Sequence, residues 1–125
     1  WQTYTHDHLA SFFELDTYFY SSFYTNNLFP VAIQFTQNYR RWFSKDMGNT
    51  YPKYGMLGFD TAFFFLQGLD KYGSSFEENM GNMMLTPIQT GFKFERVNNW
   101  GGFINRKVFF VNFTKNFELI KLDFE

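Results

Sequence analysis

The feature that most constrains the fold is an uncharged apolar run that directly follows a loop rich in proline, glycine and tyrosine. The run spans residues 61–69 and reads TAFFFLQGL, and the loop spans residues 51–60 and reads YPKYGMLGFD. A helix that is apolar on nearly every side needs cover on most of its circumference. The pattern therefore predicts a core helix over residues 58–71, in which the phenylalanines at 63, 64 and 65 are all buried in the whole protein.

Helical and strand patterns precede this helix. Residues 5–15 repeat apolar side chains at helical spacing, and Pro30 opens an amphipathic helix that we expect to end near Phe43. Between them, residues 18–24 are aromatic or apolar on both faces. That pattern predicts a strand buried within a sheet and not at its edge.

The second half of the chain changes from helix to strand. Gly73 is a natural left-handed end for the core helix, and a short helix follows, with Ser75 and Glu78 spaced as a capping box. After Pro87, alternating and apolar stretches predict short strands, separated by turn-rich segments. The sequence thus predicts an α/β fold with one strand, two main helices, a short helix and a C-terminal antiparallel β meander.

Composition and charge narrow the function classes. The net charge is −1, from 11 basic and 12 acidic residues, which argues against binding to nucleic acid. The chain has no cysteine, and its longest apolar run, residues 62–66, is too short for a transmembrane segment. Aromatic residues make up 25% of the chain, more than a domain of this size needs to fill its interior. We therefore expect a fragment, whose surplus rings face the rest of a longer protein.

No group of residues has the pattern of a catalytic site, so we predict no enzymatic activity, no cofactor and no metal. His6 and His8 flank Asp7 and carry zinc-competent groups, but this spacing near a helix start is more typical of a solvated cap. The serines at 21 and 22 lack the glycine elbow of a hydrolase, and the paired acids at 77 and 78 are typical of first-turn helix charges.

The order of these pieces resembles the C-terminal third of a type I periplasmic binding protein, the fold of branched-chain amino-acid receptors of ABC transporters. In that family a strand of the second lobe crosses a hinge into a helix of the first lobe, similar to residues 18–24 followed by 30–43. The family's loop resembles Pro-x-x-Tyr-x-x-x-Gly-Tyr-Asp-Ala, and residues 52–61 here read PKYGMLGFDT. A second hallmark, Gly-x-x-Phe-x-Phe-Asp, has a compressed counterpart in GFKFE at residues 91–95.

Further segments look like a Bacteroidetes branch of this superfamily, which is often fused to LysM modules: Trp1-Gln2, residues 18–24, Phe94-Glu-Arg96 and residues 101–105. The resemblance implies a periplasmic lipoprotein whose N-terminal two-thirds, with signal peptide and anchor, lie outside this chain. It assigns residues 1–27 to the second lobe and hinge strand, 28–88 to the first lobe, and 89–125 to the hinge return and the last strands of the second lobe.

Aromatic loop residues are the candidates for ligand binding. The resemblance aligns Tyr54 with an aromatic that lines the ligand cleft. Tyr51 and Trp100 are further candidates, because rings on loops stack on sugars or apolar ligands. A packing role is an equally open interpretation for Tyr54 and the preferred one for the other two.

Three residues receive structural roles. Asp60 is expected at the start of the core helix, where a carboxylate accepts free backbone N–H groups. Gly58 is expected at the same helix start, and Gly73 at the helix end. For Asp60, we favour the acceptance of backbone N–H groups over contact with a ligand.

The expected function is non-enzymatic solute binding in the bacterial envelope, with an amino acid, a muropeptide or a sugar held in a cleft between two lobes. The alternative is a scaffold on the same fold, which uses its aromatic surface to bind an envelope protein or peptidoglycan. A third class, an aromatic-rich carbohydrate-binding β-module, is disfavoured by the two central helices.

Overall fold

The computed structural model describes residues 5–122, with side chains from His8 onward, and the chain divides into two compact units. Unit 1 combines Trp1–Ser22 with Val108–Glu125, and unit 2 is the continuous segment Phe23–Lys107. The mixture of helices and small antiparallel sheets is the α/β class that the sequence predicts. Residues 89–107, expected to return toward the second lobe, belong to the same unit as the central helices, and the division into lobes stays a prediction.

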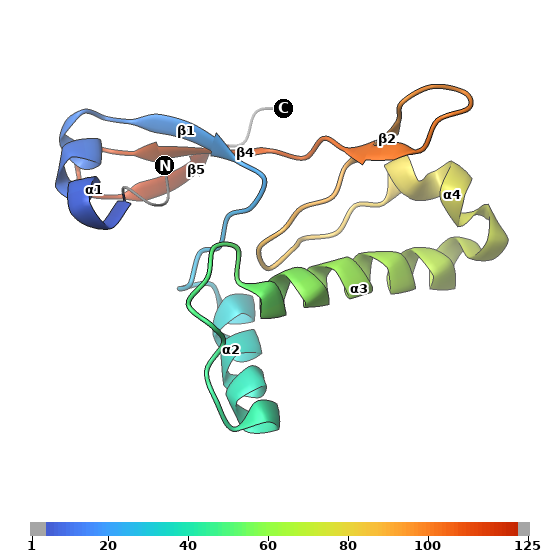
Figure 1. Cartoon of the computed structure of the whole chain (residues 1–125), viewed down its shortest axis with the longest axis horizontal. Helices are drawn as coiled ribbons and strands as arrows, with labels where there is room; N and C mark the ends of the chain where they lie inside the picture. The colour runs from blue at the N-terminus through green and yellow to red at the C-terminus, as the bar shows by residue number, and fades with distance from the viewer. Residues whose placement is uncertain (1–4, 123–125) are drawn as a thin grey trace. The chain divides into compact units, whose positions relative to one another are not determined.

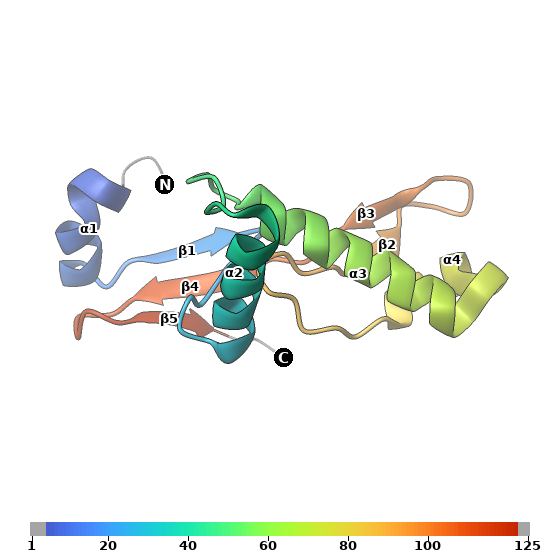
Figure 2. The ribbon, with the colours of Figure 1, turned by 90° about the horizontal axis from the view of Figure 1, so that it is seen from below.

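Unit 1 is a three-stranded antiparallel sheet with one helix (Figure 2). The helix α1 spans Thr5–Glu14, and the strands follow the order β1 (Tyr18–Ser21), β4 (Phe109–Phe113) and β5 (Leu119–Leu122). Phe113 is the centre of the aromatic core, since its ring lies 5.1–5.5 Å from three other rings. Those rings belong to Phe12, Phe13 and Phe19.

The position of β1 differs from the prediction. The sequence predicts a strand buried within a sheet, but β1 is an edge strand, and Tyr18 and Tyr20 are 62% and 70% exposed. The physical reason is that, among the described residues, the rings of α1 and β4 cover the face of Phe19 and leave the side chains of Tyr18 and Tyr20 exposed. Aromatic residues on both faces of a strand therefore do not guarantee burial on both.

Unit 2 begins with two helices (Figure 1). The helix α2 spans Pro30–Phe43, as predicted, with Pro30 in the first turn and Ser44 in a left-handed conformation after the last residue. The helix α3 spans Tyr54–Tyr72 and begins four residues earlier than the predicted Gly58. Gly58 is consequently an interior, exposed residue of α3 and not its start.

Gly73 ends α3, as predicted. Its φ of 53° is a conformation that suits glycine, and its N–H donates to the carbonyl of Leu69. Short turns of helix follow: η2 (Gly73–Ser75), α4 (Phe76–Asn79) and η3 (Met80–Asn82). The predicted capping box is wrong, because the Ser75 side chain makes no capping hydrogen bond.

After η3 the chain runs back along α3, turns, and continues into a hairpin of β2 (Phe94–Arg96) and β3 (Phe103–Asn105) (Figure 1). These strands pair in an antiparallel register that matches Phe94 with Asn105. The predicted single meander is thus two separate sheets, one in each unit, and β3 is a strand that the sequence pattern did not predict.

Unit 2 is held together along one stripe of α3. Its buried residues are Met56, Asp60, Phe64 and Gly68. Met56 packs with Ala32 and Ile88, and the Phe64 ring contacts three aromatic rings from later segments. Those rings are Phe76, Phe92 and Phe94.

Within this chain α3 is buried on one side, and the burial of all three phenylalanines in the whole protein stays a prediction. Phe64 is 2% exposed, whereas Phe63 is 41% exposed and Phe65 is half-buried. Unit 2 covers α3 on one side only, so its other side remains apolar and exposed. In the part of the chain that the structure describes, no helix has the length and apolar character needed to cross a membrane.

Candidate functional site

A buried polar cluster is centred on Asp60, a residue of α3. Its Oδ1 accepts the backbone N–H of Ile88 at 2.8 Å, and its Oδ2 accepts the N–H groups of Gln89 and Thr90, both at 2.8 Å. Hydrogen bonds to a carboxylate are stronger than bonds between neutral groups. Asp60 therefore binds the returning segment, and its predicted position at the start of the helix is wrong, because α3 begins at Tyr54.

Gln89 extends this cluster to the start of α3. Its buried side-chain amide accepts the Lys53 N–H at 2.9 Å and donates to the Lys53 carbonyl at 3.1 Å. Its backbone carbonyl accepts the N–H of Tyr24 at 2.9 Å, and burial raises the pKa of the Tyr24 phenol above its ordinary value. One glutamine therefore fixes both backbone groups of the residue that directly precedes α3.

The two candidate tyrosines flank this fixed residue. Tyr51 is 60% exposed on the loop, and Tyr54 is 68% exposed at the first position of α3, not on the loop as predicted. Within residues 5–122, neither side chain makes a hydrogen bond or a ring contact. Both rings are therefore available to a ligand while the backbone between them is held in place.

The third candidate, Trp100, lies elsewhere in the unit. It is 98% exposed in the turn between β2 and β3, where its backbone N–H donates to Asn98 Oδ1 at 3.0 Å. This turn lies at the α4 end of the unit, whereas Tyr54 begins α3 at the end next to α2 (Figure 1). Tyr51 and Tyr54 are thus neighbours along the chain at one end of unit 2, and Trp100 does not lie with them.

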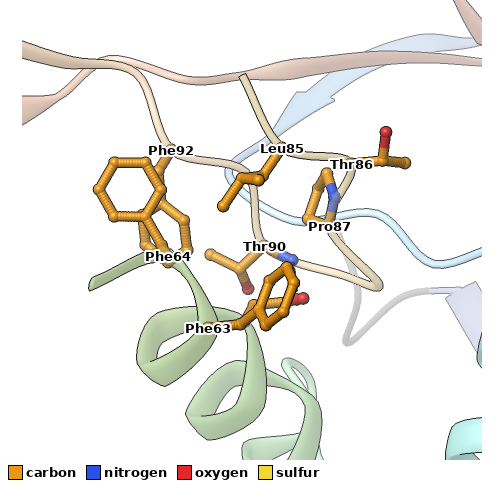
Figure 3. A pocket seen from close by; sticks show the side chains of 8 residues that line it. Phe63, Phe64, Leu85, Thr86, Pro87, Thr90 and Phe92 are labelled. Atoms are coloured by element: carbon orange, nitrogen blue, oxygen red, sulfur yellow. Dashed lines mark hydrogen bonds between the residues drawn. The ribbon is translucent and has the colours of Figure 1, made fainter. Parts of the chain in front are cut away.

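A small cavity lies beside the Asp60 cluster, between α3 and the returning segment (Figure 3). Its volume is about 20 Å³, enough for roughly one water molecule and too small for an amino acid or a sugar. Its walls are polar and apolar in similar measure, and the buried hydroxyl of Thr90 there has no hydrogen-bond partner among the described residues. The lining residues are Asp60, Phe63, Phe64, Leu85, Thr86, Pro87, Thr90 and Phe92. This cavity does not serve as the solute site.

The role of residues 88–90 is one that the sequence pattern does not predict. The available signal was Asp60 itself, a lone carboxylate followed by nine residues without charge. A buried carboxylate needs donors, and no lysine or arginine lies at helical spacing on the same stripe of α3. Backbone N–H groups from another segment were the remaining source, although the sequence does not show which segment supplies them.

The histidine pair at the chain start gives no metal site to describe. The side chains of His6 and Asp7 lie outside the described residues, and no group of three potential ligands occurs among the rest.

Comparisons with protein-family models, with curated proteins and with solved structures find no match to this chain.

Proposed function

We propose that this chain is part of a non-enzymatic solute-binding protein of the bacterial envelope, in which Tyr51 and Tyr54 form one wall of the ligand site. The observation that carries the proposal is the pair of exposed, unpartnered tyrosines on either side of the fixed Lys53 backbone. The resemblance to type I periplasmic binding proteins, in which a residue aligned with Tyr54 lines the cleft, supports the same position.

A rigid frame under exposed rings favours binding for a physical reason. Ordering mobile side chains and loops on binding costs free energy, so a prearranged site loses less of its interaction energy. The Asp60 and Gln89 hydrogen bonds fix the backbone before a ligand arrives. Tyrosine rings then provide stacking area at low conformational cost, and their hydroxyls provide donors and acceptors.

The charges near the two tyrosines favour a ligand with a carboxylate. Lys53 lies between them in the sequence, and Tyr54 begins α3, where the helix dipole places partial positive charge. The first turn of α3 contains no acidic residue that offsets this charge. An amino acid or a muropeptide therefore fits this position better than a neutral sugar does.

The test is a thermal-shift screen of the full-length protein against amino acids, muropeptides and sugars, followed by calorimetry with any ligand found. Tyr54→Ala should weaken binding by about 1–3 kcal/mol, because a stacked aromatic anchor is lost. Leu66→Ala, an equally exposed site on the same helix, is the matched control and should leave the affinity unchanged. Unchanged affinity in Tyr54→Ala, or an equal loss in both variants, would contradict the proposed site.

The outer side of α3 favours a second function, that of an envelope scaffold. Phe59, Phe63, Leu66 and Leu69 are all exposed on this helix, and no charged residue lies between Asp60 and Asp70. Exposed apolar patches of this kind are typical of interaction surfaces. A photo-crosslinking phenylalanine analogue at position 66 should then give one defined adduct in intact cells. The same analogue at position 100 is the control, and equal, diffuse adducts from both positions would argue against the scaffold.

A further inference from the structure

The free edge of β1 in unit 1 has a defined set of backbone groups. The Phe113 N–H donates to the Thr17 carbonyl at 2.9 Å, so Thr17 and Phe113 form a hydrogen-bonded pair of the antiparallel ladder. Because such pairs alternate along a ladder, Phe19 and Ser21 also point their backbone groups toward β4. The N–H and C=O groups of Tyr18 and Tyr20 consequently point away from β4, toward the edge at which no strand of residues 5–122 pairs.

The side chains of this edge strand do not protect it from pairing. Tyr18 and Tyr20 lie on the same face of the sheet, and both side chains are exposed. Edge strands are usually protected by charge, proline or a bulge, and the other edge of this sheet, β5, carries Lys121. The sequence of β1, YFYS, contains no charge and no proline.

We propose that β1 pairs with β1 of a second copy of this chain, in an antiparallel arrangement around a twofold axis at Phe19. In this register Tyr18 lies opposite Tyr20 of the second copy, and Tyr20 opposite its Tyr18. All four outward N–H groups then find carbonyl partners, and two tyrosine pairs form across the new strand boundary. The two three-stranded sheets join into one sheet of six strands.

A second copy fits this edge better than an unrelated strand does. The outward backbone groups belong to residues i and i+2, Tyr18 and Tyr20. In an antiparallel pair of two β1 strands, the outward groups of each Tyr18 therefore face those of Tyr20 in the other copy. The strand has no charge, and two copies therefore meet without like-charge repulsion. A twofold interface that uses the same patch on both subunits is the commonest form of oligomer.

The first test is sedimentation of the whole chain at rising concentration, with two variants of one residue. Tyr20→Pro removes an outward N–H but none of the hydrogen bonds to β4, and it should weaken self-association at least tenfold. Tyr20→Thr keeps the backbone donor and should still dimerise. A wild-type chain that stays monomeric at all concentrations, or a dimer that Tyr20→Pro leaves intact, would overturn the proposal.

Hydrogen exchange provides a test that does not depend on how Tyr20→Pro folds. In the wild-type chain the Phe19 amide should be protected at every concentration, because it bonds to β4 within one copy. The amides of Tyr18 and Tyr20 should gain protection only as the dimer forms. Protection of these two amides at all concentrations would show that another segment covers the edge, and fast exchange at all concentrations would show a free edge; either result excludes the dimer.

Discussion

A single carboxylate organises the start of α3 and the segment that returns to it. Asp60 accepts three backbone N–H groups, all from Ile88, Gln89 and Thr90. These groups are buried, so without the carboxylate their desolvation would not be compensated. The exposed tyrosines of the proposed ligand site depend on this cluster through Gln89, although neither contacts Asp60.

Asp60→Asn should lower the free energy of unfolding by about 2–4 kcal/mol, because the new NH₂ group faces N–H donors in place of an acceptor. Asp70→Asn is the matched control, since Asp70 is an exposed aspartate of the same helix. We expect the control to change stability by less than about 0.5 kcal/mol. Urea unfolding followed by circular dichroism measures both, and equal stabilities would show that the Asp60 cluster contributes little.

Two glycines of α3 should respond in opposite directions to the same substitution. A Cβ at Gly68 would overlap the ring of Phe76, whereas a Cβ at Gly58 would meet no atom. Gly58→Ala should therefore stabilise the protein by about 0.5–1 kcal/mol, through better helix propensity. Gly68→Ala should destabilise it by about 1–3 kcal/mol, because Phe76 must move. Melting temperatures that rise in both variants would contradict the close packing of α3 against α4.

At the scale of single elements, the sequence predicts the positions of helices more accurately than it predicts which side of each helix is buried. Pro30 and Gly73 mark one helix start and one helix end correctly, because each acts through its own backbone. The early start of α3 at Tyr54 could not be predicted in the same way, because Gln89, a residue far along the chain, binds both backbone groups of Lys53. Burial likewise depends on distant segments.

The dependence of burial on distant segments is clearest in the helix α3, where the adjacent residues Phe63 and Phe64 can be compared. Phe64→Ala should cost about 3–5 kcal/mol, since its ring is buried among three others. Phe63→Ala should cost less than about 1 kcal/mol, because Phe63 lies on the exposed side. Chemical denaturation of both variants measures the difference. Similar losses would mean that the outer side of α3 is covered in the protein in solution.

At the scale of the whole molecule, the two units differ in how they use the chain. Unit 2 is one continuous segment that contains its own core, around Met56, Phe64 and Ile88. Unit 1 is assembled from two segments that lie on either side of unit 2 in the sequence. A continuous segment with its own core meets the usual condition for independent folding.

The segment of residues 23–107, produced alone, should therefore fold. We expect a helical circular dichroism spectrum and a cooperative thermal transition, because all hydrogen bonds of the Asp60 cluster lie inside this segment. Asp60→Asn in the same segment serves as the control and should lower its melting temperature. A segment without a cooperative transition would show that unit 2 needs unit 1 in order to fold.

The division of unit 1 between two distant segments also sets the order in which a ribosome can complete the protein. Tyr20 of β1 and its partner Phe110 of β4 are about 90 residues apart. At synthesis rates of about 5–20 residues per second, β1 leaves the exit tunnel roughly 5–20 s before its partner strand does. Unit 2 can fold during this interval, but the aromatic residues of β1 remain without their own sheet. The β1 segment is therefore exposed to chaperones, proteases and aggregation until β4 emerges, and the translation rate sets the length of that exposure.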